Sequence, residues 1–234
     1  MKAMIVIPTF NETENITRLI SEVLAQDEGV EILVVDDNSP DGTGDLVDKI
    51  SRDNGRVHLL RRPGKMGLGT AYISGFRYAL QRPDIGCVFE MDADFSHEPR
   101  YIQDFLKAVE SADVVLGSRY VKGGEVKNWG LSRKLLSRGG SIFSRVMLGL
   151  PVRDCTGGFR CYRREVLEAL ELDRVNSEGF GFQVEMLHEC NKKQFKIREI
   201  PIVFADRAEG TSKMSKKIIF EAFFLVCRLR FTGR

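Results

Sequence analysis

The sequence has few cysteines and no long apolar run. Its five cysteines are widely spaced and form no CxxC pair, which argues against a disulfide framework and a zinc site and is typical of a reducing cytoplasm. The most apolar segment, 218–231, is interrupted by Glu221 and two arginines, and it is shorter than the ~20 apolar residues that span a bilayer. We therefore expect a chain that does not cross a membrane.

Targeting and glycine-rich nucleotide signatures are also missing. The amino terminus runs directly into the strand-like sequence AMIVIPTF, so we expect no signal peptide. No G-x-G-x-x-G follows the first apolar run and no G-x-x-x-x-G-K-[ST] occurs anywhere, so neither a dinucleotide site nor a P-loop is indicated. The segment GKMGLGTA (64–71) resembles a phosphate loop only superficially. A turn that caps a helix and a contact with substrate explain it about equally well.

Charge is distributed unevenly along the chain, although the formal net charge is only +2. Residues 1–50 carry eleven acids and three bases, whereas residues 119–146 carry seven bases and one acid. Residues 207–234 again carry seven bases against two acids. This pattern indicates a metal–nucleotide site in the first part and an anionic binding surface for the second.

The first half of the chain alternates short apolar runs with helical patterns. The apolar runs cover residues 4–7, 32–35, 57–60, 87–91 and 114–116. Between them, apolar residues recur at helical spacing, as at Ile16, Leu19 and Val23. Such alternation predicts an α/β fold with a mostly parallel central sheet and helices on both faces. No repeat or linker divides residues 1–234, so we expect one domain.

The second half is less regular. Its patterns predict helices over 132–150, 164–171 and 180–192, a strand over 196–204 and a terminal helix over 215–230. The first and the last of these helices are basic and amphipathic. Such a helix either lies in the headgroup region of a membrane or docks its apolar side on the protein core, and the sequence leaves both open.

Polar residues follow the predicted strands. They include Glu12, the pair Asp36–Asp37, the triplet Asp92-Ala93-Asp94 and Arg119. In open α/β sheets, ligands bind outside the carboxyl ends of the strands. Two carboxylates that flank one small residue reach a single hard cation, which shares its oxygen ligands with substrate phosphates. A solvated turn explains the triplet taken alone, but the second acidic pair favours a metal site.

Other polar residues admit two interpretations each. Asp37 and Glu12 are placed to bind a base or a ribose hydroxyl, while Glu12 also suits the start of a helix. Arg207 and Lys213 lie in a glycine-containing polar segment that either closes over a pyrophosphate or forms a basic surface. The pair formed by Arg133 and Ser137 has i, i+4 spacing, so the two side chains either hold one phosphate or belong to an ordinary surface helix.

Taken together, the motifs resemble one family. They are IPTFNE (7–12), VVDDNSPDGT (34–43), MDADFSH (91–97), GSRY (117–120), residues 129–137, CTGGFRCY (155–162), GFGFQVEM (179–186) and RAEGTSKM (207–214). In this order they resemble the dolichol-phosphate mannose synthases of glycosyltransferase family 2, which have the Rossmann-like GT-A fold. The resemblance covers nearly the whole chain, which looks like the short form without carboxy-terminal membrane spans.

The resemblance implies a donor site and a cofactor. The residues that it assigns to the nucleotide sugar are Pro8, Phe10, Glu12, Val35, Asp37, Asp92, Ala93, Asp94, Ser96, Arg119, Arg207 and Lys213. Mg²⁺ or Mn²⁺ is implied chiefly at Asp94, with Asp92 beside it. Ser96 stands where the family often has a glutamine ligand, and Phe10 stands where it often has a tyrosine, so a ring remains but a hydroxyl is lost.

The acceptor and the reaction are implied in the same way. Arg119, Arg133 and Ser137 match positions that hold a lipid phosphate, and the catalytic set comprises Asp92, Asp94, Arg119, Arg207 and Lys213. The expected reaction is an inverting transfer of mannose from GDP-mannose to a polyprenyl or dolichyl phosphate. A phosphate monoester has a second pKa of about 6 and is already largely ionised at pH 7, so no general base is expected.

Two other functions are left open by the sequence. One keeps the reaction but uses UDP-glucose, and the other is a nucleotide-binding, membrane-surface module without catalysis. The intact DAD triplet, Arg207 and Lys213 argue against the second. We expect a protein of the cytoplasm that binds the cytoplasmic face of a membrane peripherally and has no nucleic-acid partner. The need for a membrane-protein partner is left open.

Overall fold

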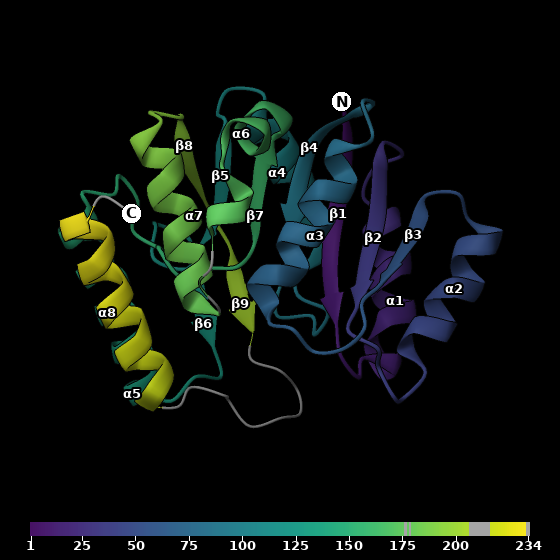
Figure 1. Ribbon diagram of the computed structural model, residues 1–234, viewed down its shortest axis with the longest axis horizontal. Coiled ribbons are helices and arrows are strands. Elements are labelled where there is room, and N and C mark those ends of the chain that lie inside the picture. Colours follow the sequence, from purple (N-terminus) through teal and green to yellow (C-terminus); the bar gives the residue numbers. More distant parts are fainter. Residues whose placement is uncertain (176, 178, 206–215, 233–234) are drawn as a thin grey trace.

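The computed structural model describes residues 1–175, 177, 179–205 and 216–232, and its central element is a seven-stranded sheet (Figure 1). The strands are β1 (Lys2–Thr9), β2 (Val30–Asp36), β3 (Val57–Arg61), β4 (Ile85–Glu90), β5 (Val114–Ser118), β7 (Arg160–Arg163) and β8 (Ile197–Pro201). Their spatial order is β3-β2-β1-β4-β7-β5-β8. Only β7 runs antiparallel to its neighbours. The predicted mostly parallel sheet is therefore confirmed.

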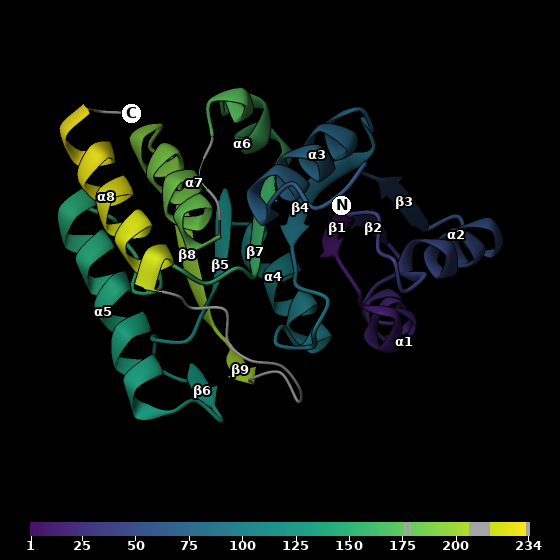
Figure 2. The same cartoon turned by 60° about the horizontal axis from the view of Figure 1, so that its bottom comes forward.

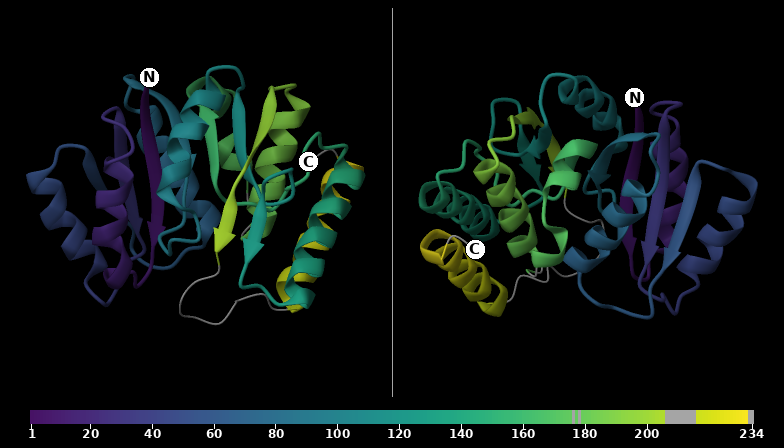
Figure 3. Two further views of the ribbon diagram at one scale, coloured as in Figure 1. Left: turned by 180° about the vertical axis from the view of Figure 1, so that it is seen from behind. Right: turned by 45° about the horizontal axis from the view of Figure 1, so that its top comes forward.

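Both faces of this sheet are buried. Strand β1 shows the reason, because Met4 and Val6 belong to one apolar cluster and Ile5 and Ile7 to the other, all with no exposed surface. This alternation is the period of two expected of a strand. The first cluster includes residues of α3 (Leu68–Leu80), α6 (Arg164–Ala169) and α7 (Phe180–Lys192); the second includes residues of α1 (Thr13–Leu24), α2 (Thr43–Asp53) and α4 (Ile102–Val109). Helices on both faces are seen in Figure 3.

The parallel strands bring their carboxyl ends to one edge of the sheet. In the ladder between β1 and β2, the last pair is Thr9 with Asp36. After each of these two strands the backbone turns into a polar loop, where Asn11 and Asn38 have φ angles of 62° and 57°. Asparagine tolerates this left-handed conformation better than most residues. This geometry places the polar residues that follow the strands at the predicted binding edge.

Two long helices lie side by side at the β8 end of the sheet (Figure 2). They are α5 (Leu131–Leu148) and α8 (Lys216–Thr232). Helix α5 ends two residues before the predicted boundary, because Gly149 adopts φ 63° and caps the helix. Among the described residues, no helix is long and apolar enough to cross a bilayer.

The predicted strand over 196–204 is divided in the structure. Its first part is β8, and its second part is β9 (Val203–Ala205), which pairs with β6 (Glu125–Lys127) in a small separate sheet. Between the two parts, the Ile202 N–H donates to the Ser118 carbonyl at 3.1 Å. The single predicted strand therefore forms one strand in each of two sheets, and periodicity alone does not show where it divides.

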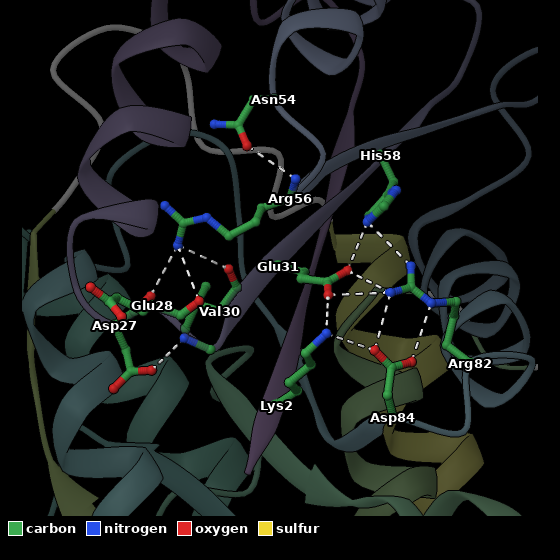
Figure 4. A network of polar contacts seen from close by, with 11 residues as sticks. Lys2, Asp27, Glu28, Val30, Glu31, Asn54, Arg56, His58, Arg82 and Asp84 are labelled. Atoms are coloured by element: carbon green, nitrogen blue, oxygen red, sulfur yellow. Dashed lines mark hydrogen bonds and ion pairs between the residues drawn. The ribbon is translucent and has the colours of Figure 1, made fainter.

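The amino ends of the strands carry a network of charged side chains at the opposite edge (Figure 4). The Glu31 carboxylate accepts hydrogen bonds from Lys2 and Arg82 and lies 2.8 Å from the His58 ring. Asp84 accepts a further hydrogen bond from Lys2 at 2.9 Å. These residues join β1, β2 and β3 to the start of β4 at a distance from the binding edge.

Candidate active site

The DAD triplet lies after β4, and each of its two carboxylates accepts a hydrogen bond from a neighbouring group. Ala93 is buried, while Asp92 and Asp94 are partly exposed. The Tyr72 hydroxyl of α3 donates to Asp92 Oδ1 at 3.2 Å, and the Ser96 N–H donates to Asp94 Oδ1 at 3.0 Å. Burial and the charge of Asp92 raise the pKa of Tyr72, which keeps its hydroxyl a donor. These hydrogen bonds therefore hold both carboxylates at the edge of the sheet where the parallel strands end.

A buried histidine supports the backbone of the triplet. His97 Nδ1 accepts a hydrogen bond from the Asp92 N–H at 3.0 Å. Its ring stacks on Phe159 with 5.0 Å between centroids. Burial lowers the pKa of His97, which is consistent with the neutral ring that this acceptor role requires. Sequence reasoning gave His97 no role, although it closes the MDADFSH motif.

The triplet fits a divalent cation that shares its ligands with a substrate. The Ser96 hydroxyl is buried and has no hydrogen-bond partner among the described residues, so it remains available near Asp94. Among all the residues that the structure describes, no group of three or more His, Cys, Asp or Glu side chains is arranged to hold a metal. Two carboxylates and a hydroxyl suit Mg²⁺ or Mn²⁺ when phosphate oxygens complete the coordination.

A fully buried carboxylate, that of Glu90, lies at the end of β4, just before the triplet. Burial raises the pKa of Glu90 to about 7. Gln183 of α7 donates to Glu90 Oε2 at 2.6 Å, and the fully buried Arg160 donates to the carbonyls of Gln183 and Cys155. These contacts tie β4, β7 and α7 together under the site. Arg160 and Gln183 lie in the motifs CTGGFRCY and GFGFQVEM, but sequence reasoning assigned no role to either of them or to Glu90.

Both members of the acidic pair after β2 are buried, and each has its own partners. Asp36 accepts hydrogen bonds from the hydroxyls of Thr9 at 2.9 Å and Ser39 at 2.6 Å. Asp37 forms a two-pronged ion pair with Arg62, at 2.5 and 2.7 Å. Arg62 was not among the predicted site residues, although it comes directly after β3, the strand beside β2. The structure thus adds a cation to the predicted nucleotide side.

The remaining predicted nucleotide residues lie near the same edge. Pro8 is half-buried in β1, and Val35 is fully buried, so that its side chain belongs to the core. Phe10 is 37% exposed, with the Lys65 ammonium 4.4 Å from its ring centroid. Glu12 directly precedes α1, and its carbonyl accepts the Ile16 N–H at 2.9 Å. The predicted position of Glu12 at a helix start is therefore confirmed, although its side chain makes no capping hydrogen bond, and its ligand role stays a prediction.

The opposite side of the site is dominated by a buried ion pair. Arg119 follows β5 and donates to both Asp154 oxygens at 2.7 Å, and also to Thr156 Oγ1 at 2.9 Å. Burial alone would lower the pKa of Arg119 and raise that of Asp154, but their mutual attraction and hydrogen bonds reverse both shifts. Asp154 is thus committed to orienting Arg119, which agrees with giving it no role as a base.

Two predicted phosphate-binding arginines lie close to the same aromatic ring. The Arg133 guanidinium lies 4.0 Å from the Trp129 ring centroid, and that of Arg119 lies 5.5 Å from it. Tyr120 and Phe204 also face Arg119, at 5.2 and 5.5 Å. Such cation–π contacts hold a guanidinium while leaving its N–H groups able to donate. The structure therefore brings Arg119 and Arg133 into one cluster.

Helix α5 also contributes hydroxyl groups to this cluster. The Tyr120 hydroxyl donates to Ser137 Oγ at 2.8 Å, and Ser141 lies 3.3 Å from Thr156 between hydroxyl oxygens. The predicted pair Arg133 and Ser137 thus lies on α5 next to Arg119, although phosphate binding itself stays a prediction. The other two predicted residues, Arg207 and Lys213, lie outside the described residues.

Comparison with known proteins identifies the family of the chain. The sequence model of glycosyl transferase family 2 matches residues 4–171. The undecaprenyl-phosphate mannosyltransferase of Micrococcus luteus is 44% identical over 234 residues, covering 100% of this chain and 96% of that protein. The polyprenol monophosphomannose synthase of Mycolicibacterium smegmatis is 44% identical over 235 residues, covering 100% and 88%.

Solved structures show the same fold at low sequence identity. Glucosyl-3-phosphoglycerate synthase from Mycobacterium tuberculosis, in complex with phosphoglyceric acid, matches with a TM-score of 0.70 at 17% identity, covering 98% of this chain and 80% of that one. Its complex with Mn²⁺, uridine diphosphate and glucosyl-3-phosphoglycerate gives a TM-score of 0.68 at 17% identity, covering 98% and 79%. The predicted GT-A fold is thus confirmed, and the chain belongs to glycosyl transferase family 2.

Proposed function

We propose that residues 1–234 form one catalytic domain that transfers mannose from GDP-mannose to the phosphate of a membrane polyprenol, with inversion. One observation carries the proposal: two full-length relatives at 44% identity are named for mannosyl transfer to such lipids. The site supports it, because a carboxylate group for a metal–diphosphate lies on one side and a cation cluster for a second phosphate on the other.

In this proposal the donor lies between the triplet and the loops after β1 and β2. Asp92 and Asp94, with Ser96 near them, would hold Mg²⁺ or Mn²⁺, whose chemistry here is neutralisation of the charge on the departing diphosphate. Tyr72 and the Ser96 N–H keep the two carboxylates in place. Arg207 and Lys213 would contribute positive charge to the same leaving group.

The acceptor phosphate would be held by the cluster of Arg119, Arg133 and Ser137. A phosphate oxygen attacks the anomeric carbon, a carbon–oxygen bond forms, and the bond to the nucleoside diphosphate breaks. Because the acceptor is already ionised at pH 7, the side chains need only position it and stabilise charge. Asp154 keeps Arg119 oriented through its two-pronged ion pair.

The enzyme would reach its lipid acceptor by binding peripherally to the cytoplasmic face of a membrane. Helices α5 and α8 carry exposed apolar side chains, among them Leu135, Val146 and Phe224, which are 64%, 74% and 67% exposed. Basic residues lie close to them, such as Lys134 and Arg138. Amphipathic surfaces of this composition lie in the headgroup region of anionic membranes.

A direct assay tests the proposal. Purified protein with Mn²⁺ and a polyprenyl phosphate is incubated with labelled GDP-mannose, UDP-glucose and other nucleotide sugars, and the lipid product is isolated. We expect mannosyl lipid from GDP-mannose with the β-anomeric configuration by NMR. Transfer from UDP-glucose alone would replace the donor in the proposal, and no transfer from any donor, with the protein folded, would reject catalysis.

A further inference from the structure

The short strand β9 contacts both sides of the candidate active site, and the function described above gives it no role. It pairs with β6 in a parallel ladder. The Ile202 N–H, just before β9, donates to the Ser118 carbonyl at 3.1 Å, and the Glu125 N–H donates to the Ile202 carbonyl at 3.0 Å. Ser118 and Glu125 flank Arg119 in the chain, so these bonds attach β9 to the side of the site that holds the cation cluster.

Strand β9 is also attached to the segment that follows the DAD triplet. The Val203 N–H donates to the Tyr101 hydroxyl oxygen at 2.9 Å. Tyr101 ends a short 3-10 helix, Pro99–Tyr101, which begins two residues after His97. His97 in turn accepts the Asp92 N–H. The bond to Tyr101 therefore attaches β9 to the metal side of the site as well.

The Phe204 side chain of β9 joins the same two sides through its ring. Its centroid lies 5.7 Å from that of His97 and 5.5 Å from that of Trp129, and both pairs meet edge to face. The Arg119 guanidinium carbon lies 5.5 Å from the Phe204 ring centroid. Edge-to-face pairs and cation–π contacts are attractive at such separations. One ring therefore contacts the histidine that supports the triplet, an arginine of the cation cluster and the tryptophan beside it.

This ring is not part of the hydrophobic core. Phe204 is partly exposed, and neither of the two apolar clusters that bury the sheet includes it. Its position therefore adds little to the packing of the sheet and suits the alignment of the two sides of the site. In a transfer reaction the acceptor oxygen must lie about 3–3.5 Å from the anomeric carbon, and a displacement of about 1 Å costs about 100-fold in rate.

We propose that Phe204 is a positioning residue that sets the separation between the DAD triplet and the cations for the acceptor phosphate, with the bond from Val203 to Tyr101 as a second connection. This assignment rests on the proposed transfer of a sugar to a phosphate. Phe204 acts through Arg119 and His97 and not by contact with either substrate. It therefore governs the rate of the bound complex more than the binding of donor or acceptor.

Single-turnover rates at saturating GDP-mannose and a short, water-soluble polyprenyl phosphate, with KM values and thermal melts, test the proposal. We expect Phe204→Leu to lower the rate about tenfold or more, while the KM for each substrate changes less than about threefold. Phe204→Tyr keeps the ring and should retain most of the rate. Tyr101→Phe removes the hydrogen bond to β9 without touching the rings, and it should lower the rate about two- to tenfold.

Phe195→Leu is the matched control. Phe195 precedes β8, is partly buried like Phe204, and packs against the first apolar cluster. Its variant should melt at a lower temperature and keep the wild-type rate.

Two outcomes would overturn the proposal. In one, Phe204→Leu keeps the wild-type rate and loses only melting temperature. In the other, it raises one KM at an unchanged rate, which would make Phe204 a substrate contact. Where Phe204→Leu does not fold, Tyr101→Phe carries the test, and an unchanged rate in that variant overturns the proposal. Wild-type protein that transfers no sugar from any donor would instead reject the proposed function together with this role.

Discussion

At the scale of single residues, the Asp92-Ala93-Asp94 triplet concentrates the expected chemistry in two partly exposed carboxylates. We predict that Asp94→Ala lowers transfer at least about 100-fold, because loss of even an indirect metal contact costs 10- to 100-fold. The melting temperature should hardly change, since the substitution removes no core volume. Rates with Mn²⁺ and thermal melts measure the two effects.

Glu98 provides the matched control for this substitution. It is an acid four residues further on, paired with Arg100 at 2.8 Å outside the site. Glu98→Ala should keep the wild-type rate. Wild-type turnover by folded Asp94→Ala would show that the metal is held elsewhere.

For substitution of Asp154, the partner of Arg119, we predict that stability falls together with activity. Asp154→Asn leaves a buried guanidinium without its counter-charge, which costs about 3–5 kcal/mol of unfolding free energy. Urea denaturation at pH 7 measures this loss. The double variant Arg119→Met/Asp154→Leu should regain much of the stability and remain inactive. A fully active double variant would remove Arg119 from the acceptor site.

At the scale of elements, α5 and α8 pack against each other, and each carries exposed apolar side chains. Phe143 of α5 stacks on Phe223 of α8, with centroids 4.9 Å apart. Phe223 therefore has a role in packing the two helices, whereas Phe224 is 67% exposed. Phe224→Ser combined with Leu135→Ser on α5 therefore removes exposed apolar side chains and keeps the contact between Phe143 and Phe223.

We predict that wild-type protein binds anionic liposomes reversibly, that salt weakens binding, and that Leu135→Ser/Phe224→Ser largely abolishes it. Sedimentation with liposomes of graded anionic lipid content measures binding. The variant should still transfer sugar to a short, water-soluble polyprenyl phosphate. Equal binding by variant and wild type, or no wild-type binding at all, would contradict an interfacial role for these helices.

At the scale of the whole molecule, the edge of the sheet opposite the site carries the Glu31 network (Figure 4). Burial alone would raise the pKa of Glu31, but His58, Arg82 and Lys2 outweigh it and hold the pKa below its usual 4.5. A carboxyl group with a depressed folded-state pKa stabilises the fold fully above its unfolded pKa. Its contribution is lost as the pH falls through the folded value.

Glu31→Gln should therefore cost about 1–3 kcal/mol of unfolding free energy at pH 7. The difference from wild type should shrink as the pH falls below about 4.5. Denaturant titrations across this range measure it. The transfer kinetics at pH 7 should stay unchanged, because the network lies at the amino ends of the strands. A changed donor or acceptor KM would show that the two edges are coupled.

The sequence by itself determined the layered α/β architecture and the edge of the sheet at which the candidate site residues gather. Strands buried on both faces are continuous apolar runs, as at Ile5 and Val6, and helices repeat apolar residues with a period of 3.6. Both patterns are local, so they can be recognised in the chain without its partners. Parallel strands then place their polar ends at one edge. The strand end that carries the DAD triplet was found in this way, as was α5, which begins at Leu131, one residue before the predicted start.

Only the tertiary structure decided which distant side chains meet. Arg62 binds Asp37 across 25 residues, and Arg119 binds Asp154 across 35. Two arginines come to lie close to the Trp129 ring, and β7 inserts antiparallel between β4 and β5. No periodicity encodes such pairs, because they depend on how loops close and how strands are ordered. The fold thus follows from local burial patterns, whereas the detailed charge pairing of the site follows from topology.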